Sequence, residues 1–93
     1  MPVVWDAAKD RINKAKHGVS FEVARLVFDD PLHFSVPDRS EHGEERWETT
    51  GVAGSVVLLV VVHTYESNGE EFIRIISARR ANRRERQRYE QET

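Results

Sequence analysis

The stretch VVLLVVV, residues 56–62, is the longest apolar run in this chain of 93 residues. Five of its seven residues are valine, whose branched β-carbon favours extended backbone. Because no polar residue interrupts the run, we expect other elements to cover both faces of the strand. Seven residues are also too few to cross a bilayer as a helix. The sequence therefore predicts a buried central strand.

Segments with a period of two, which is typical of strands, lie on both sides of this run. The expected neighbouring strands are residues 32–36, 46–52 and 72–77. The expected connections are a charged loop at 38–44, a tight turn at 53–55 and a hairpin turn at Ser67-Asn68-Gly69. The central part of the chain therefore predicts four strands in succession.

Helical signals flank these strands towards both ends of the chain. After a short strand at 3–5, Asp6 is expected to cap a helix that runs to about Lys16. Its apolar face would consist of Ala8, Ile12 and Ala15. Ser20 is expected to cap a second helix over residues 21–28. Near the C-terminus, Asn82 and Glu85 have the spacing of a capping box, which predicts a last short helix.

Helices followed by a run of strands predict an α+β protein with an antiparallel sheet, two N-terminal helices and a short C-terminal helix. At this length we expect one domain, residues 1–93. The chain holds no cysteine, which excludes disulfides and thiolate metal sites. Its N-terminus lacks the pattern of a signal peptide, and we expect a cytoplasmic protein without a membrane segment.

Charge is distributed unevenly along the chain. Residues 1–73 hold 7 Lys and Arg against 13 Asp and Glu, whereas residues 74–93 hold 7 Arg against 3 Glu. A cluster made only of arginine matches the geometry of phosphate groups. The same cluster is also compatible with a solvated basic helix or with a surface that binds an acidic protein.

Five blocks of sequence occur together in one known family. They are Trp5-Asp6 followed by Lys9 and Asn13; KHGVSF at 16–21; VFDDP at 27–31; Glu45-Arg46-Trp47; and IISAR at 75–79 followed by Ala81, Arg83, Glu85-Arg86 and Tyr89. In this order and spacing they resemble the BrnT toxins over nearly the whole chain. The blocks at 16–21 and from 75 onwards are the most specific.

The resemblance implies a fold similar to that of the RelE-type ribonucleases. It also implies a type II toxin that cleaves RNA without a metal or other cofactor and slows translation. The expected partner is a BrnA-like antitoxin with a ribbon-helix-helix fold, which would cover the arginine surface. The complex would repress its own operon, so that the toxin meets operator DNA only through the antitoxin.

Two positions depart from the pattern of the family. Glu66 stands near the place where many members carry an arginine in the hairpin, and Ser55 follows Gly54 where many have arginine. Both changes remove a cation near the expected RNA side. They put the strength and specificity of RNA contact in question, although not the fold.

Metal-free cleavage of RNA needs a base, a cation beside the phosphate and an acid for the leaving oxygen. The candidate catalytic residues are Arg79, Arg74, His63 and Glu45. Arg79 is the first choice because it closes the most specific block, and His63 titrates near neutrality in its unperturbed state. The candidate RNA-binding residues are Lys9, Lys16, Arg83, Arg86 and Trp47. The four histidines, at 17, 33, 42 and 63, lack the spacing of a zinc site.

Each candidate also has a structural interpretation. His63 would then be an ordinary strand residue, Glu45 a partner of Arg46, and Arg74 a paired arginine on the sheet.

Two other functions stay open at this point. The chain could be a catalytically weak module that binds the antitoxin as a corepressor, or a direct nucleic-acid-binding regulator. The regulator is disfavoured because residues 1–73 are acidic and no recognition helix appears.

Overall fold

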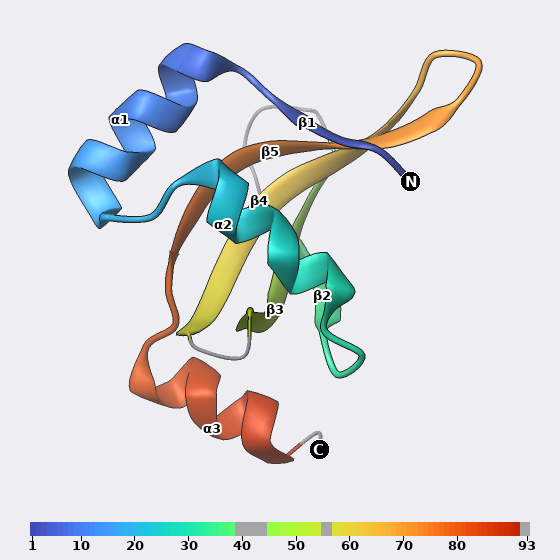
Figure 1. Ribbon diagram of the computed structural model, residues 1–93. Coiled ribbons are helices and arrows are strands. Elements are labelled where there is room, and N and C mark those ends of the chain that lie inside the picture. Colours follow the sequence, from blue (N-terminus) through green and yellow to red (C-terminus); the bar gives the residue numbers. More distant parts are fainter. Residues whose placement is uncertain (39–44, 55–56, 92–93) are drawn as a thin grey trace.

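The computed structural model of this chain describes residues 1–38, 45–54 and 57–91. Five strands form one sheet in the order β1-β5-β4-β3-β2, and α1, α2 and a 3₁₀ segment, η1, precede β2 in the chain (Figure 1). The strands are β1 Val3–Trp5, β2 Phe34–Asp38, β3 Arg46–Ala53, β4 Val57–Ser67 and β5 Glu71–Arg80. The predicted α+β class is confirmed. Within the described ranges, no helix is long and apolar enough to span a membrane.

The sheet is mixed, so the prediction of an antiparallel sheet is wrong at one edge. The pairs β2–β3, β3–β4 and β4–β5 are antiparallel, but β1 runs parallel to β5. The chain leaves β1 through helices and reaches the partner of β1 only at its last strand. This long crossover allows the two strands to run in the same direction, which a short hairpin does not.

β4 is the central strand, as the apolar run predicts. Its residues Leu58 to Val61 are at most 3% exposed. The strand continues to Ser67, five residues beyond the predicted end, because it forms a long hairpin with β5. Gly69 in the turn has a φ of 75°, a conformation that glycine adopts without strain. Ser55, the second departure from the family pattern, lies outside the described residues, as does Val56.

β2 starts and ends later than predicted and includes Pro37. Pro37 lies opposite Trp47, and among the described residues no strand pairs with the other edge of β2. Proline is tolerated there because an edge strand does not need every backbone N–H as a donor.

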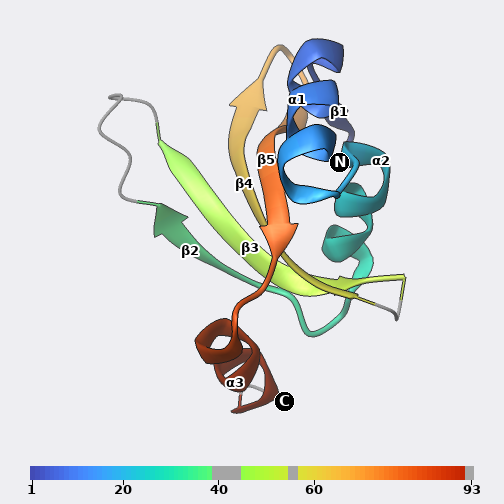
Figure 2. The same cartoon turned by 90° about the vertical axis from the view of Figure 1, so that its left-hand side faces the viewer.

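α2, residues Phe21–Ala24, and η1, residues Arg25–Asp29, cover one face of the sheet (Figure 2). Together they span the predicted helix 21–28, but its second half is a 3₁₀ helix. The core formed between these elements and the sheet includes Phe21, Val27, Leu59, Val61 and Ile75. We call the opposite side of the sheet the open face.

α1, Ala7–His17, does not bury the predicted apolar face. Ile12 is 66% exposed, and Ala8 and Ala15 are exposed too. The buried residue is Asn13, whose side-chain amide donates to the carbonyl oxygen of Ala78 at 2.9 Å and accepts from its N–H at 3.1 Å. Asn13 thus takes the place of a strand partner along β5 beyond the point where β1 ends.

α3, Arg83–Gln91, begins with the predicted capping box. The N–H of Glu85 donates to Asn82 Oδ1 at 2.8 Å, and the N–H of Asn82 donates to Glu85 Oε1 at 2.9 Å. The helix buries no residue completely. It is fastened by the Tyr89 hydroxyl, which donates to Asp30 Oδ2 at 2.6 Å, and by Arg88, which lies over the Phe34 ring. Polar contacts therefore hold α3 at the end of the open face.

Candidate functional site

The register of the sheet determines which polar side chains share the open face. Leu59 and Val61 belong to the core under α2 and η1, so their neighbours Val60 and Val62 face the other way. Val60 lies opposite Arg79, and Val62 lies opposite Glu48. An arginine of β5 and a carboxyl group of β3 are therefore placed on the same face, on either side of β4.

Arg79, the first choice from the sequence, lies where β5 approaches α3. Its two terminal nitrogens donate to the two carboxylate oxygens of Glu85 at 2.7 and 2.9 Å. These hydrogen bonds raise the pKa of Arg79 above its ordinary value. The Arg79 side chain is still 41% exposed. The guanidinium is thus held by α3 on one side and accessible on another.

Glu48 is a candidate that the sequence did not predict. Burial raises its pKa, and a hydrogen bond with the Asp38 carboxyl and the charge of Asp38 raise it further. The positive charge of Arg79 acts in the opposite direction. A carboxyl group with a raised pKa on the same face as an arginine is a candidate for proton transfer. The alternation of residues along a strand could have indicated it, because Glu48 lies on the same face of β3 as Arg46 and Thr50.

Arg74 lies at the other end of β5. Its Nε donates to Glu66 Oε2 at 3.0 Å, which also accepts from the Thr64 hydroxyl at 2.6 Å. The hydrogen bond from Thr64 has the largest effect on the pKa of the half-buried Glu66 carboxyl, and together with the bond from Arg74 it lowers that pKa. Glu66 therefore stands near the place where the family pattern has an arginine, and it also pairs with Arg74.

The two candidate arginines do not form a clamp for one phosphate. Arg79 lies five residues after Arg74 along β5, which is roughly 16 Å of extended backbone. Glu66 holds the first and Glu85 holds the second, at opposite ends of the strand. The site therefore centres on Arg79.

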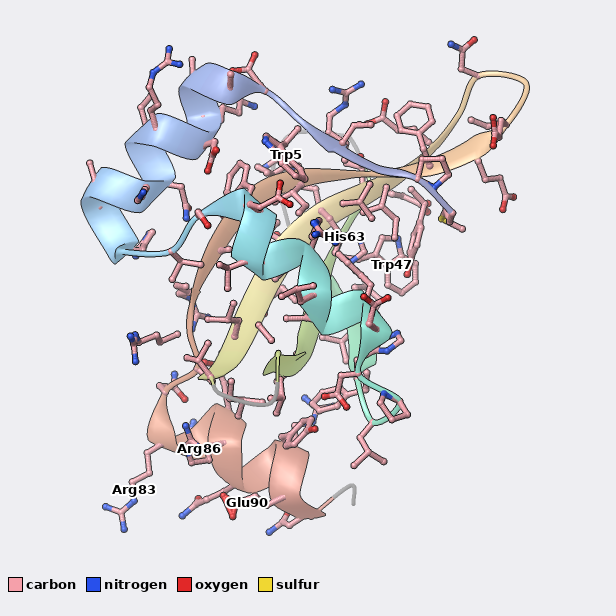
Figure 3. All side chains as sticks on the ribbon, viewed as in Figure 1. Trp5, Trp47, His63, Arg83, Arg86 and Glu90 are labelled. Atoms are coloured by element: carbon pink, nitrogen blue, oxygen red, sulfur yellow. The ribbon has the colours of Figure 1, made fainter. Side chains whose placement is uncertain are left out.

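His63 does not lie on the open face. It has no exposed surface, its Nε2 is 2.6 Å from Thr49 Oγ1, and its ring contacts the rings of Phe28 and Tyr65 (Figure 3). Burial lowers its pKa to about 4. An imidazole enclosed under η1 cannot reach an RNA phosphate, and this corrects the expectation of a catalytic histidine.

Glu45 and Trp47 lie at the start of β3. Glu45 is exposed, directly before the strand. Trp47 lies opposite His63, hence on the side of the sheet that α2 and η1 cover, and its ring contacts Tyr65 edge to face at 5.7 Å. The structure therefore brings Trp47 to the face opposite that of Glu48 and Arg79.

The remaining basic candidates lie around the open face. Arg83 and Arg86 are exposed on α3 (Figure 3). Lys9 and Lys16 are exposed on α1, where they line a groove with Ile76 and Ser77 of β5. Among the residues that the structure describes, no three His, Cys, Asp or Glu side chains form a group that could hold a metal ion. His42 lies outside the described residues.

Comparisons with known proteins identify the family and a similar fold. The family model described as the ribonuclease toxin BrnT of type II toxin–antitoxin systems matches residues 5–85. The crystal structure of the Brucella abortus ribonuclease toxin BrnT has a similar fold, with a TM-score of 0.68 and 22% sequence identity. The match covers 89% of this chain and 99% of that one. A search of curated proteins found no match.

The fold and the family match together define a ribonuclease toxin of a type II toxin–antitoxin system. Within that class, the chain belongs to the BrnT family. The family resemblance seen in the sequence is confirmed, and an antitoxin is the partner that this class implies.

Proposed function

We propose that this chain, acting as a single domain, is an endoribonuclease that cleaves RNA at the open face without a metal ion. The observation that carries the proposal is the position of Glu48 and Arg79 on one face, with Asp38 beside Glu48. These residues supply a carboxyl pair for proton transfer and a cation for the phosphate. A mixed sheet with helices on one face also fits the RelE-like fold that we infer for the family.

Cleavage in this site would use the 2′-hydroxyl of the RNA as the nucleophile. The carboxylate of the Glu48–Asp38 pair takes the proton of that hydroxyl, whose oxygen attacks the phosphorus atom. Arg79 stabilises the negative charge that grows on the phosphate oxygens. The protonated carboxyl of the pair gives its proton to the 5′-oxygen as the bond to phosphorus breaks. A cyclic phosphate and a free 5′-hydroxyl result.

The basic residues of α3 would hold the RNA backbone next to this site. Arg83 and Arg86 are exposed beside the bond between Glu85 and Arg79, so they are placed to follow the chain of phosphates. Arg74 would contact RNA only from the far end of β5. We assign proton transfer to the Glu48–Asp38 pair rather than to Glu45.

The biological role follows the family. We infer that RNA cleavage inhibits translation in the cytoplasm and that a BrnA-like ribbon-helix-helix antitoxin neutralises the toxin. Operator DNA would be bound by the antitoxin alone.

A second function is favoured by one observation, which is that both Arg79 and Arg74 are bonded to carboxylates. In that case the chain would be a catalytically weak corepressor.

Expression of the chain alone in a bacterium tests the proposal. We expect growth arrest with decay of RNA, and we expect Arg79→Ala to abolish both while the purified variant keeps its circular dichroism spectrum. Normal growth with a folded wild-type product would favour the corepressor instead. Full toxicity of Arg79→Ala would show that the ribonuclease uses another site.

A further inference from the structure

The exposed side of α1 and the neighbouring edge of β5 form a groove of about 260 Å³. Its lining is Lys9, Ile12, Asn13, Lys16, His17, Ile76 and Ser77. Ser77 lies opposite Val62, so the groove borders the open face that carries Arg79. It is therefore continuous with the proposed RNA-cleaving surface.

The floor of this groove is apolar. It includes the exposed side of α1, where a surface helix usually carries polar side chains. Ile12 is 66% exposed and Ile76 is half-buried beside it. The helix cannot turn Ile12 inwards, because Asn13 is fixed to β5 and to the carbonyl oxygen of Val19 by hydrogen bonds. The exposure of Ile12 is thus built into the docking of α1.

The rim of the groove is basic. Lys9 and Lys16 flank Ile12 by about one helical turn on either side, and both are exposed. Within the described ranges, neither lysine takes part in an ion pair. The nearby carboxylates accept hydrogen bonds from backbone groups, since Asp6 caps α1 and Asp10 accepts from the N–H of Phe21.

We propose that this groove binds an acidic amphipathic segment of the antitoxin, with an apolar side chain over Ile12 and Ile76 and carboxylates on Lys9 and Lys16. The inference rests on the proposed function, in which an antitoxin is the partner. An exposed aliphatic floor favours a polypeptide, because an RNA backbone gains little from contact with isoleucine. A segment in this position would lie along the open face and hinder the access of RNA to Arg79.

The test measures binding of the cognate antitoxin, labelled with a fluorophore, by anisotropy. Ile12→Glu places a charge in the apolar floor and should weaken binding by about 30-fold, the size of an interface hot spot. Val23→Glu is the matched control, since Val23 is also an exposed aliphatic residue of a helix, 41% exposed, and does not line the groove. It should leave the affinity unchanged. Lys9→Glu with Lys16→Glu should also weaken binding.

The outcomes separate this inference from the proposed function. If wild type and Ile12→Glu bind the antitoxin equally well, the groove is not the docking site, whether or not the chain cleaves RNA. If the lysine variant loses RNA cleavage but keeps its affinity for the antitoxin, the groove is an RNA surface and the inference is overturned. If Ile12→Glu loses the antitoxin but still cleaves RNA with wild-type kinetics, the inference is supported.

Discussion

Glu85 holds Arg79 through two parallel hydrogen bonds of 2.7 and 2.9 Å, and the same carboxylate caps α3 by accepting from the N–H of Asn82. One side chain thus fixes both the start of the helix and the cation of the proposed site. The position of Arg79 depends on whether α3 is folded and docked.

Replacing Glu85 with Gln should separate these two tasks. The amide oxygen can still accept from Asn82, but the charged pair with Arg79 is lost. We expect a loss of about 1 kcal/mol in the free energy of unfolding, reduced by the partial exposure of the pair. We also expect slower RNA cleavage with little change in KM. Asn82→Ala, which removes a cap and leaves the pair, should lower stability with a smaller effect on kcat; equal kcat values for the two variants would contradict the positioning role.

The burial of His63 predicts a dependence of stability on pH. Its pKa is about 4 in the folded protein against 6.5 in an unfolded chain. A depressed pKa contributes stability above pH 6.5 that is lost as the pH falls towards 4, by about 3 kcal/mol for this shift. Denaturant unfolding between pH 7 and pH 4 measures it, and an NMR titration of His63 with a midpoint near 6.5 would refute the assignment.

The raised pKa of Glu48 predicts the opposite dependence of stability on pH. Its folded pKa lies above the ordinary value of 4.5, so its contribution to stability is greatest below that pH and declines as the pH rises through the folded pKa. Glu48→Gln should therefore be more stable than wild type at pH 7, and the difference should shrink as the pH approaches 4.5. A Glu48→Gln variant that is less stable than wild type at pH 7 would show that the carboxylate is well accommodated.

Asn13 should be one of the most sensitive positions of α1. Asn13→Ala leaves the N–H and carbonyl of Ala78 and the carbonyl of Val19 without their buried partner. We expect a loss of roughly 2–4 kcal/mol in the free energy of unfolding. Lys14→Ala, at the next and exposed position, is the control and should stay within about 0.5 kcal/mol of wild type. Similar values for the two variants would mean that water replaces the amide.

Removal of the Tyr89 hydroxyl should loosen α3. The bond from this hydroxyl to Asp30 raises the pKa of Tyr89 to about 12. In Tyr89→Phe the helix keeps its capping box but loses this attachment, so we expect about 1 kcal/mol of lost stability. Faster amide hydrogen exchange should appear in residues 83–91 and not in β4. Unchanged exchange in α3 would show that Arg88 and Glu85 suffice to dock it.

Much of the fold could be predicted because apolar periodicity identifies strands and helices. The run at 56–62 predicted β4, and the spacing of Asn82 and Glu85 predicted the start of α3. The orientation of α1 could not be predicted in this way. Its apolar positions pointed to one face, but the open edge of β5 needs hydrogen-bond partners, and Asn13 supplies them. The spacing of apolar residues does not reveal that the edge of β5 needs hydrogen-bond partners.

The candidate site was harder to predict, because proximity depends on register. His63 has the same parity as Leu59 and Val61, which indicates the covered face once β4 is known to continue past residue 62. The predicted strand ended at residue 62, so His63 was not assigned to the covered face. Glu48 was missed because its partners Asp38 and Arg79 come from other strands. Arg79, taken from the family motif, lies where the proposed site needs a cation.

Cleavage of a defined RNA by the purified chain in the presence of a chelator tests the central claim most directly. We predict that wild type cleaves the RNA and that Arg79→Ala and Glu48→Gln, both folded, are each slower by a factor of about 100 or more. Arg83→Ala should instead raise KM. Cleavage by Glu48→Gln and Arg79→Ala at the wild-type rate would contradict the account of the open face as the catalytic site.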